Sequence, residues 1–220
     1  MKTEALQSVE PAAGPAGQSG TDSAAPWTVD PSEILLADWV FAYGSLIWNP
    51  EFDFEERRLA RVRGYHRTFC ISSTRYRGTP QQPGVVLGLA PGGSVSGMAF
   101  RLREDARMQA LVRLYEREMP DLVYAPRLLN ARLDDGRTVR ALGFVANPAS
   151  PAYLDLHEDE ITRRLCGCAG SRGPNCEYAI NTFHALESLG VHDARLARLV
   201  RRIEAQADPA FLARHRRIEP

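Results

Sequence analysis

The chain has 220 residues, of which 44% are hydrophobic and 25% are charged. This length and composition suit one globular domain with a sizeable core, and they do not require a second domain. Basic and acidic residues number 27 each, so the formal net charge is zero, which excludes a global field that would attract nucleic acid or an acidic membrane. We therefore expect the partner to be a small molecule, with neither nucleic acid nor membrane involved.

The first residues of the chain predict a tail. From Met1 to about Ser32 the sequence is rich in Ala, Pro, Gly, Ser and Thr and poor in branched apolar residues, so it cannot bury enough surface to offset the entropy of ordering. We expect a disordered tail over residues 1–34, one folded domain over 35–207 and a C-terminal extension over 208–220.

Location follows from what the sequence lacks. No run approaches the ~20 apolar residues that span a bilayer, and residues 1–20 have neither the basic nor the apolar region of a secretion signal. We expect a cytoplasmic protein and, because disulfides are rare in that compartment, four reduced cysteines. The spacing of Cys166, Cys168, Cys176 and His184 does not match a structural zinc site, so we expect no metal.

The folded part opens with strands. Residues 39–43 form a run of aromatic and β-branched residues, interrupted only by Ala42, with alternating faces. This run stops at a Gly-Ser pair, which predicts a buried strand followed by a loop. A second extended region covers residues 60–73. Residues 84–90 and 94–102 flank Pro91-Gly92-Gly93 as two strands flank a hairpin turn.

Helices and a further hairpin follow. Met108, Leu111, Leu114 and Tyr115 recur at helical spacing and predict an amphipathic helix over residues 105–118. Two strands, 122–133 and 138–146, bracket an Asp-Asp-Gly-Arg turn, and helical patterns then cover 158–168, 175–189 and 193–205. Hairpins interrupted by helices favour an α+β class or a small mixed barrel over a doubly wound sheet.

The loop after the first strand is one candidate for chemistry. Gly44 and Ser45 directly follow the buried strand. Such a turn exposes backbone N–H groups, and glycine lets a ligand approach the main chain. The pattern is compatible with an anion or oxyanion cradle, but a Gly-Ser pair after a strand is more often an ordinary turn.

Glu118 is the second candidate. It lies four residues after Leu114, so helical geometry turns its side chain toward the apolar face, while Glu116 falls on the outer face. Burial and the negative end of the helix dipole both raise the pKa of such a carboxyl group, which would make it a general base. The alternative is that Glu118 forms a partly buried ion pair with Arg127 or Arg75.

Several segments together resemble the ChaC family of γ-glutamylcyclotransferases, over roughly residues 38–203. The opening strand and its Tyr-Gly-Ser-Leu loop are the most similar, and the other segments follow in the family's order. They are residues 40–48 (VFAYGSLIW), 73–80 (STRYRGTP), 83–84 (PG), 97–102 (GMAFRL), 117–119 (REM) with Tyr124, 133–137 (LDDGR) and 173–178 (GPNCEY).

The resemblance implies a fold and a reaction. The fold would be α+β, a small mixed β-barrel-like sheet with flanking helices. The enzyme would cleave glutathione to 5-oxoproline and cysteinylglycine without any cofactor, because the substrate's own α-amine attacks its γ-carbonyl. Glu118 would be the catalytic base. The substrate-binding residues would be Val40, Phe41, Ala42, Tyr43, Gly44, Ser45, Leu46, Arg75, Tyr124 and Tyr178.

Two other functions remain open at this point. The same fold could act on other γ-glutamyl amino acids or amines, although Leu46, where that more distant branch has Asn, favours the ChaC branch. The chain could also be a non-catalytic γ-glutamyl-binding module. An intact Glu118 argues against this module, because binding alone needs no base.

Overall fold

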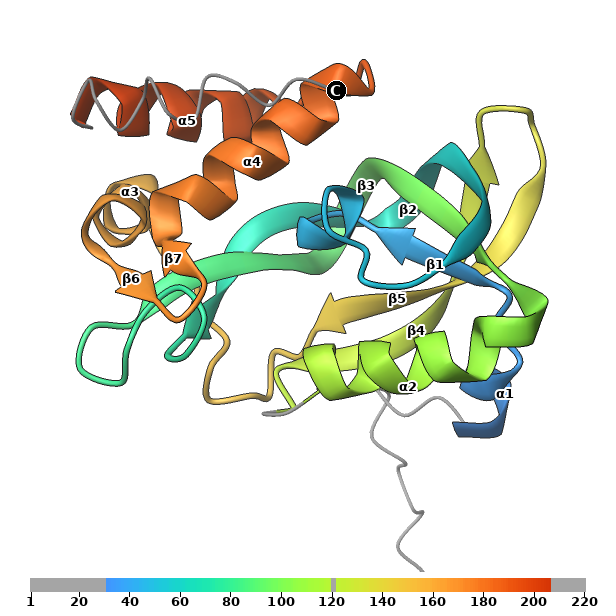
Figure 1. The fold of residues 1–220 in the computed structure, drawn as a ribbon. Helices are drawn as coiled ribbons and strands as arrows, with labels where there is room; N and C mark the ends of the chain where they lie inside the picture. Colours follow the sequence, from blue (N-terminus) through green and yellow to red (C-terminus); the bar gives the residue numbers. More distant parts are fainter. Residues whose placement is uncertain (1–30, 120–121, 207–220) are drawn as a thin grey trace, which may run out of the picture.

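The computed structural model describes residues 31–119 and 122–206, and its main feature is a closed five-stranded barrel with helices on two sides (Figure 1). The predicted α+β class with a barrel-like sheet is confirmed. The elements in chain order are α1 (Pro31–Leu35), β1 (Trp39–Ala42), η1 (Ser45–Ile47), β2 (Phe54–Ser73), β3 (Gly84–Leu102), η2 (Glu104–Ala106), α2 (Arg107–Glu118), β4 (Tyr124–Leu133), β5 (Thr138–Ala146), α3 (Glu158–Gly167), β6 (Ala169–Gly170), β7 (Gly173–Pro174), α4 (Asn175–Ser188) and α5 (Ala194–Gln206).

The short strand β1 closes the barrel. It pairs antiparallel with β3 on one side and parallel with β5 on the other. Because alternate side chains of a strand point to opposite faces, Phe41 joins the core beneath α3, α4 and α5, whereas Val40 and Ala42 join a second core beneath α1 and α2. Both faces of β1 are therefore buried, which is why every residue in this strand is apolar.

The predicted hairpin turn at Pro91-Gly92-Gly93 is wrong. Strand β3 runs through these residues and pairs with β2 on both sides of them. Gly92 and Gly93 have φ values of 97° and 75°, and Gly64 on β2 has a φ of 88°. Two residues of β3 thus lie opposite one of β2, so the glycines form a β-bulge instead of a chain reversal.

The true reversal between β2 and β3 is the segment 74–83, at the far end of a long two-stranded ribbon. The β2 strand has 20 residues and β3 has 19. In Figure 1 the ribbon leaves the barrel and carries this segment to β6 and β7, below α3 and α4. The ribbon therefore brings residues 74–83 close to a part of the chain about 90 positions later.

Helix α2 lies along the sheet on the opposite side from α3, α4 and α5 (Figure 1). Leu111 and Leu114 are buried as predicted, but Met108 is exposed. Helix α2 begins at Arg107, after the 3-10 turn η2, so Met108 belongs to its first turn and lies beyond the edge of the core.

Helix α1 is the first described element of the chain. The first 30 residues of the predicted tail, and the predicted extension over 208–220, lie outside the described residues. Residues 31–35 form α1, and Ile34 is buried in the core beneath α1 and α2. No helix within the described residues combines the length and apolarity needed to cross a membrane.

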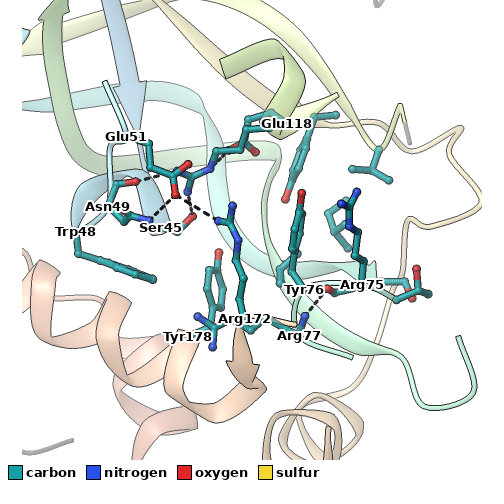
Figure 2. A pocket seen from close by; sticks show the side chains of 18 residues that line it. Ser45, Trp48, Asn49, Glu51, Arg75, Tyr76, Arg77, Glu118, Arg172 and Tyr178 are labelled. Atoms are coloured by element: carbon teal, nitrogen blue, oxygen red, sulfur yellow. Dashed lines mark hydrogen bonds and ion pairs between the residues drawn. The ribbon is translucent and has the colours of Figure 1, made fainter. Parts of the chain in front are cut away.

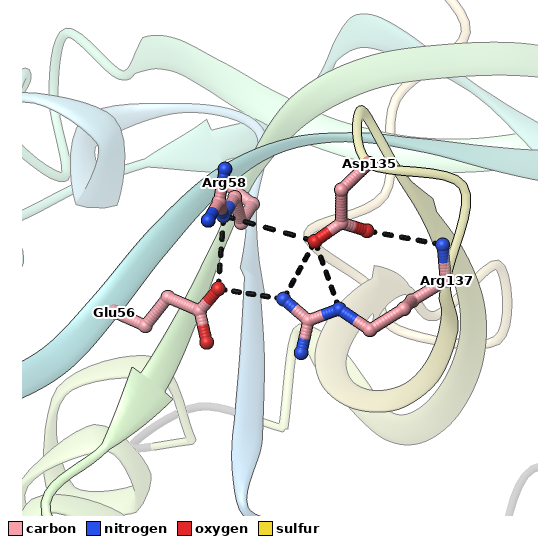
Figure 3. A network of polar contacts seen from close by, with 4 residues as sticks. All are labelled: Glu56, Arg58, Asp135 and Arg137. Carbon is pink, nitrogen blue, oxygen red and sulfur yellow. Dashed lines mark hydrogen bonds and ion pairs between the residues drawn. The ribbon is translucent and has the colours of Figure 1, made fainter.

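An ion-pair network ties the β4–β5 turn to β2 (Figure 3). Arg137 contacts Glu56 at 2.6 Å and Asp135 at 2.7 Å, and Arg58 contacts Glu56 at 2.8 Å. These groups are solvated, so the pairs add little to the free energy of unfolding. The network helps to hold the β4–β5 turn beside β2, but the stability of the barrel depends on its apolar core.

Candidate active site

A cavity opens between the barrel, the C-terminal end of α2 and the start of α4. Its wide outer lobe has a volume of about 390 Å³, and a small inner lobe of about 30 Å³ continues toward β1. Four residues line both lobes: Ser45, Glu118, Tyr124 and Tyr178. All four are among the site residues expected from the sequence, although they come from four separate segments.

The loop after β1 forms one wall of the inner lobe. Tyr43, Gly44, Ser45 and Leu46 all line it. A Cβ atom at Gly44 would lie 3.0 Å from the hydroxyl oxygen of Tyr178, so glycine allows α4 to bring this hydroxyl group against the loop. Gly44 therefore allows the loop after β1 and helix α4 to lie close together, in addition to forming a turn.

Val40, Phe41 and Ala42, the other three residues expected from this segment, do not line either lobe. Their side chains are completely buried in the two cores. They hold β1, and with it the loop, in position.

Glu118 is the last residue of α2, and its side chain faces the cavity with 16% of its surface exposed. Burial raises its pKa above the ordinary value, while the guanidinium groups of Arg117 and Arg172 act in the opposite direction. Glu116 is exposed, so the predicted helical phase is confirmed. The ion-pair partner of Glu118 is Arg117, at 3.1 Å from its Nε to the carboxylate, whereas the sequence suggested Arg127 or Arg75.

Arg117 links the loop to Glu118, a role that the sequence reasoning did not assign to it. Its side chain is only 9% exposed. One amino group donates to the Ser45 hydroxyl at 2.8 Å, and the other donates to the Asn49 carbonyl at 2.9 Å and pairs with Glu51 at 2.9 Å. Helical phase gave no signal for this residue, because the length of the arginine side chain lets it reach the loop from the flank of the helix.

Three tyrosine hydroxyls lie near Glu118 but differ in what they bind. Tyr43 donates to the Phe144 carbonyl at 2.6 Å, and Tyr124 donates to the Leu87 carbonyl at 2.8 Å. The Tyr178 hydroxyl instead accepts a hydrogen bond from the Leu87 N–H at 3.4 Å. Tyr178 therefore keeps its own proton for another acceptor. Burial raises the pKa of all three hydroxyl groups, so they remain protonated at neutral pH.

The outer lobe is lined by aromatic and cationic side chains (Figure 2). Arg75, expected from the sequence, lies there with its guanidinium carbon 5.3 Å from the centre of the Tyr76 ring. Arg172, which the sequence reasoning did not single out, lies 4.5 Å from the same ring. Arg77, also in this wall, pairs with Glu177 at 3.1 Å.

The four cysteines do not form part of this lining. All are free thiols, and Cys166 is the exposed one. Within residues 31–119 and 122–206, no three His, Cys, Asp or Glu side chains are grouped so as to hold a metal ion.

Comparisons with known proteins identify the family of this chain. A family model described as ChaC-like protein matches residues 38–206. The glutathione-specific gamma-glutamylcyclotransferase of Escherichia coli K12 is 40% identical over 156 residues, which are 70% of this chain and 68% of the relative. The glutathione-specific gamma-glutamylcyclotransferase 1 of Homo sapiens is 32% identical, with 88% of this chain and 90% of the relative covered.

Solved structures show the same fold. The crystal structure of a γ-glutamylcyclotransferase specific to glutathione from yeast matches with a TM-score of 0.71. The match covers 76% of this chain and 95% of the yeast chain at 20% sequence identity. At this identity the likeness supports the fold and not the details of the site.

Proposed function

This chain belongs to the ChaC-like family, and from that membership we propose that it is a γ-glutamylcyclotransferase that cleaves glutathione to 5-oxoproline and cysteinylglycine. The relatives from Escherichia coli and Homo sapiens carry this activity in their names. The observation in the structure that supports it most directly is Glu118, a buried carboxylate with a raised pKa where the two lobes of the cavity meet.

The reaction requires the substrate to fold back on itself. The nitrogen of the α-amine attacks the γ-carbonyl carbon, a five-membered lactam forms, and the bond from that carbon to the cysteine nitrogen breaks. No water molecule or protein nucleophile enters the product. The enzyme holds the nitrogen and the carbonyl group in contact, which makes the attack effectively unimolecular. It also transfers one proton and stabilises the negative charge that develops on the carbonyl oxygen.

In this proposal Glu118 accepts and later returns the proton. The α-ammonium must lose a proton before it can attack, and a carboxylate whose pKa is raised toward neutrality is a better base than an exposed one. The same carboxyl group then returns the proton to the departing cysteine nitrogen. Proton transfer is therefore complete without a second acid.

Tyr178 and the loop after β1 stabilise the negative charge that develops on the γ-carbonyl oxygen. The Tyr178 hydroxyl keeps a free proton and lies against Gly44, so it is the tyrosine best able to donate to an oxyanion in the inner lobe. Tyr124 stays a substrate-binding residue by shape, because its proton is already donated to the Leu87 carbonyl. Arg75 remains the proposed partner for a substrate carboxylate.

The direct test is to incubate the purified protein with reduced glutathione and to measure 5-oxoproline and cysteinylglycine by mass spectrometry, with γ-glutamylalanine as a parallel substrate. We expect both products from glutathione. Glu118→Gln should lower kcat by a factor of about 10²–10⁴, the usual contribution of a general base, while Glu116→Gln on the exposed face of α2 should retain full activity.

Other outcomes would each remove a part of the proposal. Product mainly from γ-glutamylalanine would move the chain to the broader branch of cyclotransferases. Tight binding of glutathione without products would identify a binding module. Appreciable turnover by Glu118→Gln would exclude Glu118 as the base.

The domain boundaries and the location of the protein are part of the proposal. We propose one catalytic domain over residues 35–207, to which the buried Ile34 of α1 also belongs. The rest of the 1–34 tail and the 208–220 extension would flank it, in a cytoplasmic protein whose partner is glutathione and not nucleic acid. Cytoplasmic placement is consistent with glutathione as substrate and with four free thiols. Cell fractionation with an antibody against the folded domain would test it.

A further inference from the structure

The outer lobe of the cavity carries more positive charge than its own carboxylates balance. Four arginines line it: Arg75, Arg77, Arg117 and Arg172. Arg77 is paired with Glu177, and Arg117 is paired with both Glu51 and Glu118. The two remaining guanidinium groups, those of Arg75 and Arg172, both lie near the Tyr76 ring, at 5.3 Å and 4.5 Å from its centre.

Arg172 is held there by the backbone. It lies in the turn between β6 and β7, and its N–H donates to the Tyr76 carbonyl at 3.0 Å. The N–H of its neighbour Ser171 donates to the Arg75 carbonyl at 2.9 Å. The main chains that carry Arg75 and Arg172 are thus joined directly, although the two residues are nearly 100 positions apart in sequence.

The side chain of Arg172 has only a weak carboxylate partner. Its nearest contact is Glu51 at 3.8 Å, whereas Arg117 approaches the same carboxylate to 2.9 Å (Figure 2). Arg75 has no carboxylate within ion-pair distance among the described residues. The Arg172 side chain is 40% exposed, so a ligand can reach it from the mouth of the cavity.

We propose that Arg172, beside Arg75 and the Tyr76 ring, binds the C-terminal glycine carboxylate of glutathione and thereby selects a tripeptide. This inference rests on the proposed function. If the γ-glutamyl end lies at Glu118, the cysteinylglycine part must extend into the outer lobe, and two extended residues span roughly 7 Å. A planar guanidinium group at the mouth matches a terminal carboxylate, which it can bind through two parallel hydrogen bonds.

The test combines a variant of the protein with a variant of the substrate. Initial rates are measured for wild type and Arg172→Gln with glutathione and with glutathione whose glycine carboxylate is converted to the carboxamide. Arg163→Gln, an exposed arginine on α3 that pairs with Glu160, is the matched control. The four rates for wild type and Arg172→Gln form a thermodynamic cycle that isolates the contact between Arg172 and the glycine carboxylate.

We expect the wild type to lose about tenfold in kcat/KM on the carboxamide, mostly through KM, which is typical of one lost charge-assisted hydrogen bond. Arg172→Gln should show a similar loss on glutathione and no further loss on the carboxamide, and Arg163→Gln should behave as wild type. Equal losses for Arg172→Gln on both substrates, or equal turnover of both by the wild type, would overturn the inference while leaving the cyclotransferase activity in place. If the wild type did not cleave glutathione at all, the proposed function itself would fail.

Discussion

At the scale of single residues, Tyr124 and Tyr178 differ in their hydrogen bonding, which the sequence could not reveal. Both Tyr124 and Tyr178 are buried near Glu118 and hydrogen-bonded to the backbone of Leu87. Tyr124 donates in this contact and Tyr178 accepts. Only Tyr178 therefore has a proton to offer to a developing oxyanion.

This difference predicts unequal effects of removing the two hydroxyl groups. Tyr178→Phe should lower kcat by a factor of about 10²–10³, the usual effect of losing one oxyanion donor. Tyr124→Phe should change kcat by less than about tenfold and should lower stability by about 1–3 kcal/mol, because the Leu87 carbonyl loses its donor. Steady-state kinetics and denaturant unfolding on both variants would measure this. A large fall in kcat for Tyr124→Phe would reverse the assignment.

Arg117 is a positioning residue in this site, and its positive charge lowers the pKa of the Glu118 carboxyl group. Burial raises the pKa of Glu118, and the guanidinium group of Arg117 is the strongest influence that lowers it. Arg117→Met should therefore raise that pKa further and move the acidic limb of the kcat/KM profile to higher pH. Arg117→Lys keeps the charge and should shift the limb less.

The pH profile separates this role from a purely structural one. Arg113→Met, on the exposed face of the same helix, should leave the limb where it is in the wild type. A profile of unchanged shape and lower height for Arg117→Met would mean that Arg117 only holds the loop and does not tune Glu118.

At the scale of elements, the site depends on how α4 joins the β2–β3 ribbon. Asn175, the first residue of α4, is fully buried, and its amide group accepts from the Val85 N–H at 2.7 Å and donates to the Val85 carbonyl at 2.8 Å. A side-chain amide thus replaces a neighbouring strand at this point of β3. The contact sets the position of Tyr178 one turn later in α4.

Asn175→Ala should therefore be strongly destabilising. It would leave a buried N–H and a buried carbonyl of Val85 without partners, at a cost of about 1–3 kcal/mol for each group. We expect a loss of about 3 kcal/mol in the free energy of unfolding, measured by urea denaturation. Asn130→Ala on the exposed face of β4 should change it by less than about 0.5 kcal/mol. If Asn175→Ala lowered the free energy of unfolding as little as Asn130→Ala, water would be able to replace the side-chain amide.

At the scale of the whole molecule, the ionised carboxylate of Glu118 lowers the stability of the folded protein, because burial disfavours its charge. The pKa of Glu118 is raised in the folded protein, so the protonated group contributes stability that is fully present below its ordinary pKa. That contribution is lost as pH rises through the folded-state value. Above that value, the buried charge opposes folding, and only part of its cost is offset by Arg117.

Glu118→Gln should for this reason melt at a higher temperature than the wild type at pH 8, and the difference should shrink at pH 4. The neutral amide has a similar shape and cannot ionise. Thermal unfolding followed by circular dichroism at both pH values would measure the two differences, with Glu116→Gln as the control that should not change. A lower melting temperature for Glu118→Gln at pH 8 would mean that the ion pair with Arg117 outweighs the cost of burial.

Local pattern by itself determined much of this protein. Helical spacing was sufficient to place Glu118 on the inner face of α2 and Glu116 on the outer face, and the Asp-Asp-Gly-Arg turn was sufficient to define the β4–β5 hairpin. The colinear segments identified the family. These features depend on neighbours within a few residues, so the sequence records them directly.

Tertiary structure alone decided the features that depend on distant partners. The glycines at 92 and 93 form a bulge because β2 continues beside them, and β1 closes the barrel because β5 offers it a parallel edge. Arg117 reaches the loop only because α2 packs beside β1, and the turn that carries Arg172 contacts the backbone of Arg75 and Tyr76 only once the ribbon and the β6–β7 turn are side by side. Periodicity reports which face of an element is buried, but the burial of a face does not specify which other element covers it.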